Sequence, residues 1–238
     1  MPRKSNDTGN LMTTRYIRPG KRPTTEDGDL RNVRKFKSLK LALKKLEPFI
    51  RNGRHLQIGD EFKNFGMLRS RELLGNWLLC VATNATVGDD RYTFTTDTDG
   101  GDGHIVNERN GSVLATEHVF VPGPHPGAPT GRTDTEPMAL ILEKIEHKND
   151  PKYAGRSLVV LCNDGGTGAA WYPNRLAKSL PDGLPFEAVW VMSLQGTSRG
   201  AYTYGVTWLQ FGLRPEGVPV WRVTIAPDFD SWTVEQLQ

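Results

Sequence analysis

Two uninterrupted apolar runs, at 157–162 and 186–194, constrain the fold more than any other feature of the chain. Such runs are typical of strands that are covered on both faces, because a strand with one face in water alternates apolar and polar residues. A helix is expected between them, at 173–180. Strand, helix and strand in this order predict a right-handed parallel crossover. The sequence therefore predicts an α/β fold with a mixed central sheet flanked by helices.

Periodicity and turn residues predict the remaining elements. Ser38 is a plausible N-cap for a helix that Pro48 should end. Asn110-Gly111 lies between two apolar runs and predicts a hairpin over 103–121. The other expected elements are helices at 70–83 and 137–148 and strands at 91–96, 206–211 and 218–225.

Composition is that of an ordinary soluble protein. The chain has 238 residues, is 37% hydrophobic and has a mean hydropathy of −0.49. No run approaches the roughly 20 apolar residues that span a bilayer, and no apolar run begins the chain as in a secretory signal. Cys80 and Cys162 lie in apolar runs, which favours buried free thiols over a bridge. We therefore expect a cytoplasmic protein.

The net charge of +3 conceals a strong asymmetry. Residues 1–54 hold fifteen Lys or Arg against five Asp or Glu, and the rest hold fifteen against twenty-two, so +10 and −7 sum to +3. We therefore divide the chain into a basic, partly disordered N-terminal arm with a helix, at 1–54, and an α/β domain at 55–238. The basic segment suggests a nucleic-acid partner, although a solvated tail without a partner has the same composition. The side chains expected to meet phosphate are Lys40, Lys44, Lys45, Arg51 and Arg54.

Two acids in the predicted hairpin carry the chemistry. Asp102 stands at the start of one strand and Glu117 lies in the partner strand, fifteen positions on. Residues placed in this way across an antiparallel pair can converge on one face. Paired carboxylates suit Mg²⁺ or Mn²⁺, which polarises a phosphodiester and helps to deprotonate an attacking water.

With this order of elements, 70–194 resembles the PD-(D/E)xK superfamily of nucleases, which includes many restriction endonucleases and repair nucleases. The resemblance implies a restriction-endonuclease-like core and Mg²⁺-dependent cleavage of DNA. It also implies that Asp102 and Glu117 hold the metal and that Glu72, on the opening helix, assists. Many nucleases of this kind act as dimers, so the resemblance makes a homodimer possible.

The chain departs from the family pattern at one position. The family places a lysine two residues after the second acid, where this chain has Val119. The lysine can instead come from the following helix, with Lys144 the first candidate and Lys148 the second. Otherwise the site is altered or inactive. Two functions thus remain open: a metal-dependent endodeoxyribonuclease, and a non-catalytic nucleic-acid-binding or assembly protein on the same scaffold.

Other motifs carry less weight. Glu146-His147-Lys148 spells a literal E-x-K, but its place at a helix end favours a solvated terminus. The glycines at 165–168 precede a predicted helix, as in phosphate-binding loops; a tight turn explains them better, and a nucleotide-binding enzyme is the weaker alternative. A loop at 97–102 fails the EF-hand pattern, and the three histidines at 104, 118 and 125 match no zinc motif.

Overall fold

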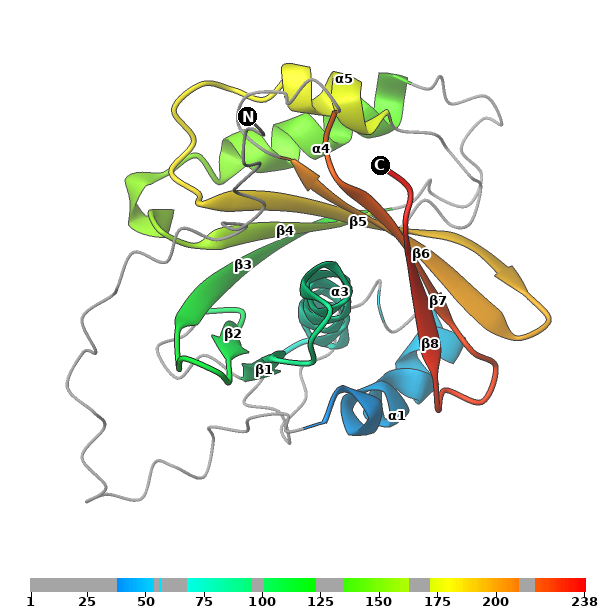
Figure 1. The fold of residues 1–238 in the computed structure, drawn as a ribbon. Coiled ribbons are helices and arrows are strands. Elements are labelled where there is room, and N and C mark those ends of the chain that lie inside the picture. Colours follow the sequence, from blue (N-terminus) through cyan, green and yellow to red (C-terminus); the bar gives the residue numbers. More distant parts are fainter. Residues whose placement is uncertain are drawn as a thin grey trace, which may run out of the picture.

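The described part of the chain forms one curled sheet with helices on both faces (Figure 1). The computed structural model describes residues 38–53, 56, 68–95, 101–122, 135–162, 172–209 and 217–238. Its eight strands follow one another across the sheet in chain order. They are β1 (Tyr92–Thr95), β2 (His104–Asn107), β3 (Val113–Val121), β4 (Ser157–Cys162), β5 (Ala188–Ser198), β6 (Ala201–Leu209), β7 (Val220–Ile225) and β8 (Trp232–Gln236).

Strand directions confirm the α/β class and the mixed sheet. The central strands β3, β4 and β5 run parallel, and every other neighbouring pair is antiparallel. The predicted crossover is therefore present between β4 and β5, which carry the two apolar runs. The Asn110-Gly111 turn also forms as predicted, and it joins β2 to β3 with Gly111 in the left-handed region at φ 70°.

Helices cover the two faces of the sheet unequally. Figure 1 shows α3 (Ser70–Val87) on the concave side, enclosed by the curled sheet, while α4 (Thr135–His147) and α5 (Pro173–Lys178) cover the opposite side. A short 3₁₀ turn, η3 (Pro151–Tyr153), links α4 to β4. The burial of β4 follows this arrangement. Its alternate residues Val159 and Leu161 join the core around α3, and Leu158 and Val160 join the core beneath α4.

Helix α1 (Leu39–Arg51) packs into the same core as α3. Ser38 caps it as predicted, because the Leu41 backbone N–H lies 3.3 Å from the Ser38 hydroxyl. The prediction that Pro48 ends the helix is wrong, since Pro48 lies inside it. The apolar stripe continues to Ile50, which is buried. We infer that this burial outweighs the backbone hydrogen bond that a proline removes.

The remaining predictions concern the two cysteines, the last strands of the sheet and the parts of the chain outside the described residues. Cys80 and Cys162 are buried free thiols, as expected. Strand β8 was not predicted from the sequence, and β6 begins at Ala201, five residues before the predicted start. Among the described residues, no helix is both long and apolar enough to cross a membrane. The N-terminal arm before residue 38, Arg54, the loop at 97–100, His125 and the glycines at 165–168 lie outside the described residues.

Candidate active site

Three acidic side chains approach the point where β2 stops pairing with β3. Glu72 lies in the first turn of α3, Asp102 lies two residues before β2, and Glu117 lies within β3. Glu72 is 7% exposed and Glu117 is 9% exposed. Because charged side chains are almost never buried without partners, each of these carboxyl groups requires an explanation.

Asp102 occupies the free edge of β3. Its Oδ2 accepts a hydrogen bond from the His118 backbone N–H at 2.7 Å. The β2 pairing stops at His104, so this carboxylate takes the place of a missing strand neighbour. Asp102 therefore lies beside Glu117, the residue that precedes His118. The structure thus places the Asp102 carboxylate on the backbone of the residue that follows Glu117, so the two predicted acids are neighbours along β3.

The lysine that reaches these acids is Lys148. Its Nζ lies 2.5 Å from Glu117 Oε1 and 3.2 Å from the Tyr153 hydroxyl, and its side chain is about a quarter exposed. Lys144, one turn earlier on α4, lies 3.5 Å from Glu143 instead. The interpretation of Lys148 as a solvated helix terminus is therefore wrong. The turn at η3 folds Tyr153 against Lys148 and directs the ammonium toward β3.

Arg156 is a residue of this group that sequence reasoning did not assign to it. Its guanidinium NH1 lies 3.9 Å from Glu117 Oε2. Arg69 and Arg71 flank Glu72 on the other side of the group and influence its charge. The three acids are thus surrounded by four cationic side chains: Arg69, Arg71, Lys148 and Arg156. Such a mixture attracts anions such as phosphate to a site that also contains carboxylates.

The acids approach from different sides of β3. Alternation along β3 places Glu117 on the face of Val119 and Val121, which pack in the core beneath α4. Glu72 comes from α3 on the concave face, and Asp102 lies at the strand edge between the two. Asp102, Glu117 and Lys148 therefore form the central group, and Glu72 interacts with it through Asp102.

Burial raises the pKa values of two of the acids, and charge repulsion adds to the shift of one of them. Burial, followed by repulsion from Asp102, raises the pKa of Glu72 to about 7. Burial also raises the pKa of Asp102, although the His118 backbone N–H and the nearby Lys148 partly oppose the shift. Perturbed carboxyl groups of this kind gather at functional sites more often than elsewhere, because catalysis needs acids and bases that exchange protons near neutral pH.

The raised pKa of Glu72 predicts a loss of stability as the pH rises. Between pH about 4.5 and about 7, the unfolded chain releases this proton while the folded chain still binds it, so the free energy of unfolding falls by up to about 3 kcal/mol. Asp102 contributes in the same direction. Urea denaturation between pH 5 and 8 should show this fall in the wild type. Glu72→Gln, which retains an acceptor for the Arg69 N–H, should reduce it; an equal fall in both proteins would contradict the assignment.

The donor set suits a hard cation. Among the described residues, no group of three or more His, Cys, Asp or Glu side chains is arranged to hold a metal ion. Mg²⁺ does not require such a cage, because it keeps several waters and binds one or two carboxylates together with substrate phosphates. Asp102 and Glu117 supply two carboxylates of this kind. The residues therefore fit Mg²⁺ or Mn²⁺ in their chemistry.

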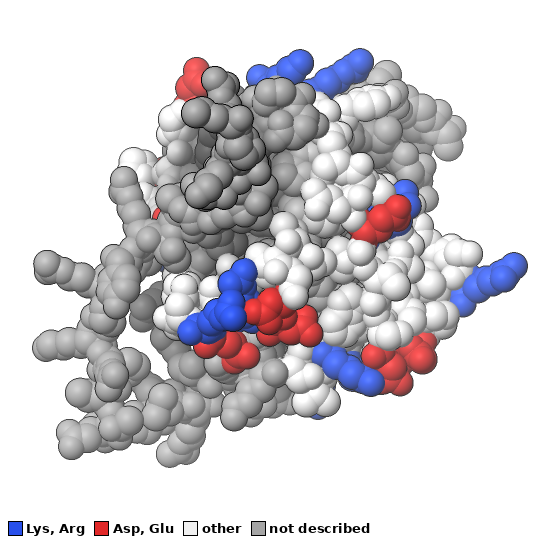
Figure 2. Space-filling view, viewed as in Figure 1, with Lys and Arg blue, Asp and Glu red and all other residues white. Residues whose placement is uncertain are grey.

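The cations of α1 are largely paired with acids. Lys44 Nζ lies 3.2 Å from Asp230 and Arg51 Nε lies 2.9 Å from Glu47, while Lys40 lies 3.8 Å from Asp230. Lys45 is exposed. Figure 2 shows Lys and Arg beside Asp and Glu along the lower edge of this face of the molecule. The turn between β7 and β8 therefore neutralises part of the surface that the sequence assigned to phosphate.

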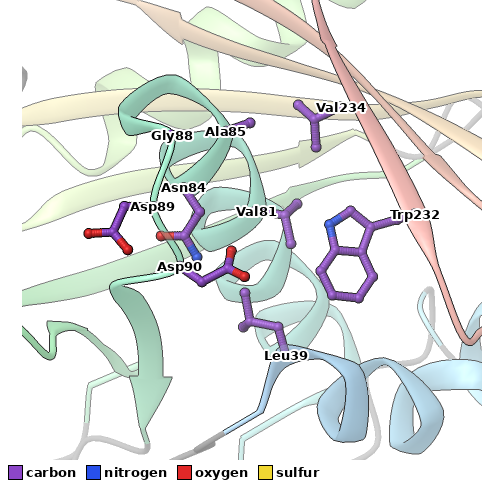
Figure 3. A pocket seen from close by; sticks show the side chains of 9 residues that line it. All are labelled: Leu39, Val81, Asn84, Ala85, Gly88, Asp89, Asp90, Trp232 and Val234. Atoms are coloured by element: carbon purple, nitrogen blue, oxygen red, sulfur yellow. The ribbon is translucent and has the colours of Figure 1, made fainter.

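A separate cavity of about 540 Å³ lies between the start of α1, the end of α3 and β8 (Figure 3). Leu39, Val81 and Trp232 form apolar walls, and Asp90 lies across from the indole of Trp232. None of the acids or lysines predicted from the sequence lines it. The cavity and the group around Glu117 are therefore different places on the molecule.

Comparisons with family models, with curated proteins and with solved structures found no match. The function must therefore be inferred from the geometry and chemistry of the residues themselves.

Proposed function

We propose that this protein is an Mg²⁺-dependent nuclease with a PD-(D/E)xK-like core that hydrolyses phosphodiester bonds in DNA. One observation carries the proposal: Lys148, just after α4, bonds Glu117 on β3 and influences the charge of Asp102, which lies just before β2 at the edge of β3. These are the two acids that the resemblance implies, together with the second of the two lysines that could replace the family's lysine. Since the position that the family uses is Val119, the proposal assigns the role of the lysine to Lys148, which directly follows α4.

In this proposal Asp102 and Glu117 hold the metal ion. When bound, Mg²⁺ polarises the phosphoryl group and lowers the pKa of a water molecule. Lys148 supplies positive charge for the phosphate as negative charge develops on its oxygens. Arg156, which shares Glu117 with Lys148, adds a second cation for the same purpose. Glu72, with a pKa of about 7, is able to exchange a proton with water near neutral pH.

A second function is favoured by a specific observation. The Asp102 carboxylate already accepts a hydrogen bond from the backbone at the free edge of β3, and Glu117 already has Lys148 as an ion-pair partner. Both acids therefore have structural roles that explain their burial without catalysis. A non-catalytic nucleic-acid-binding or assembly protein on the same scaffold is the alternative, and it predicts salt-dependent DNA binding without metal-dependent cleavage.

Lys144 in α4 and Lys148, the residue that follows α4, provide a matched test. Lys148→Met is expected to slow Mg²⁺-dependent nicking of supercoiled plasmid by about 10²- to 10³-fold, the usual effect of removing one group that stabilises developing charge. Lys144→Met changes the same residue type one turn away and should stay within about twofold of the wild type, because its side chain contacts Glu143 and not Glu117. Equal rates for the two variants would exclude Lys148 from the reaction.

Binding measured beside cleavage separates the two functions. Fluorescence anisotropy with a labelled duplex, over a series of salt concentrations, reports phosphate contacts whether or not the DNA is cut. A wild type that binds DNA but does not nick it with Mg²⁺ or Mn²⁺ favours the alternative. The cytoplasmic location and the homodimer remain predictions.

A further inference from the structure

Asn76 lies between Asp102 and His118 and bonds both. Its Nδ2 donates to the Asp102 backbone carbonyl at 2.9 Å, and its Oδ1 lies 3.0 Å from His118 Nε2. Asn76 is fully buried and lies one helical turn after Glu72 on α3, so both side chains project toward Asp102. One face of α3 thus places both the Glu72 carboxyl group and the Asn76 amide near Asp102.

The two contacts of Asn76 show that the ring nitrogen Nε2 of His118 carries a proton. A carbonyl can only accept, so the side-chain nitrogen of Asn76 must face Asp102 and its oxygen must face His118. His118 Nε2 therefore carries the proton and donates it to Asn76 Oδ1.

Two glycines allow this close packing. A Cβ on Gly75 would lie 2.7 Å from His118 Cε1, so α3 can approach the imidazole only without a side chain there. A Cβ on Gly103 would lie 2.6 Å from Asn76 Nδ2, and Gly103 also has a φ of 120°, which other residues rarely adopt. The absence of a side chain at Gly75 thus makes room for His118, and its absence at Gly103 makes room for Asn76.

Hydrogen bonds hold the segment around Asp102 at several points. Asn76 holds the Asp102 carbonyl, the His118 backbone N–H holds the carboxylate, and Thr116 holds the next carbonyl, that of Gly103, through its hydroxyl at 3.0 Å. The His118 ring bonds Asn76 and so couples the first two contacts. The position of this carboxylate therefore depends on residues that do not bear the negative charge.

We propose that Asn76 and His118 are positioning residues that hold the Asp102 carboxylate at the edge of β3, where the nuclease site needs it. The proposal rests on the proposed function for its catalytic consequence. Partners of metal ligands have this role in many sites, and their removal costs about 10- to 100-fold in activity or metal affinity. Neither residue needs to touch the substrate.

Asn84 provides a matched control on the same helix. It is buried, lies two turns after Asn76, and also makes two hydrogen bonds to a neighbouring backbone, those with the Tyr92 carbonyl at 3.0 Å and the Tyr92 N–H at 2.8 Å. Asn84→Ala therefore removes the same kind of contact from α3 without affecting Asp102. Any general loss of stability should be similar in Asn76→Ala and Asn84→Ala.

The test combines hydrogen exchange with kinetics. In Asn76→Ala, exchange of the His118 amide should accelerate at least about tenfold relative to core amides such as those of Val160 and Val191, because its acceptor on Asp102 is no longer held. With Mg²⁺ and supercoiled plasmid, kcat should fall by about 10- to 100-fold while KM stays within about threefold. Asn84→Ala should show neither selective change.

A milder variant keeps the test valid if Asn76→Ala does not fold. His118→Gln places a side-chain amide donor near the position of Nε2 and should stay within about fivefold of the wild-type kcat, while His118→Leu should show the full loss. Unchanged protection of the His118 amide in Asn76→Ala, or equal losses in Asn84→Ala, would overturn the positioning role. Selective loss of protection in a protein whose wild type cleaves no DNA would retain the positioning role and reject the nuclease.

Discussion

Glu117→Gln is expected to lower the Mg²⁺-dependent rate of DNA cleavage by at least about 10³-fold. The change removes one of two anionic metal donors, and a bound metal is worth several kcal/mol of transition-state stabilisation, where each 1.36 kcal/mol is a factor of ten. Glutamine keeps the shape of the side chain, and its oxygen can still accept from Lys148, so the fold should survive. Single-turnover cleavage of a labelled duplex with saturating protein measures this rate.

Glu235→Gln is the control for this change. Glu235 is an exposed acid on β8 whose Oε2 lies 2.8 Å from Arg222, so the substitution removes the same charge from an ion pair away from β3. Its cleavage rate should stay within about twofold of the wild type, because exposed ion pairs contribute little to stability. Glu117→Gln protein that is folded and cuts as fast as this control would contradict the role of Glu117.

The largest effect on stability is expected for Trp190→Ala. Trp190 lies in β5, is 2% exposed, and stacks between Trp208 and Trp221 with ring centroids 5.5 Å and 5.8 Å away. Replacing a buried tryptophan by alanine costs about 3 to 5 kcal/mol, since it removes apolar contacts and leaves a cavity. Urea denaturation followed by far-UV circular dichroism should show this loss in the free energy of unfolding.

Trp232 provides the comparison for Trp190. It lies on β8 at the edge of the sheet, is only partly buried, and contacts Trp77 edge-to-face at a centroid distance of 5.2 Å. Trp232→Ala should therefore lower the free energy of unfolding less than Trp190→Ala does. The reason is that Trp232, on an edge strand, buries less apolar surface on folding. Equal losses for the two variants would show that the tryptophan stack is not the centre of the core.

The central strands of the sheet could be predicted because their pattern is local. A continuous apolar run requires cover on both faces, and residues 158–161 alternate between the two cores as this reasoning requires. Asn110-Gly111 likewise encodes its turn within two residues. Strand β8 was missed because its apolar residues Trp232 and Val234 alternate with polar ones in a short run, a weak signal without its neighbour β7.

In the candidate site, the approach of the two acids could be predicted from the sequence, but the choice of lysine could not. The hairpin predicted that Asp102 and Glu117 approach each other, because cross-strand proximity follows from the turn. The choice between Lys144 and Lys148 depends instead on how α4 ends and on how η3 returns the chain to β4. A basic residue at a helix end suggests a solvated position, and only the contact with Tyr153 and Glu117 shows that Lys148 is held inward.

The ion pairs of α1 could not be predicted from the sequence for a related reason. Lys40 and Lys44 lie off the apolar stripe of the helix, so the sequence correctly places them outside the core. Their partner Asp230 is nearly two hundred residues away in the chain, and no local pattern indicates that the turn between β7 and β8 covers this face. Ion pairs between distant segments depend on the tertiary fold, and they reduce the charge that a polyanion would meet.

The most direct test of the nuclease proposal is the nicking of supercoiled plasmid by the wild-type protein, with Mg²⁺ and with EDTA. The proposal predicts conversion to the open-circular form with Mg²⁺ and none with EDTA, since Asp102 and Glu117 act through the metal. Absence of nicking with both Mg²⁺ and Mn²⁺, or equal nicking with EDTA, would contradict the proposal.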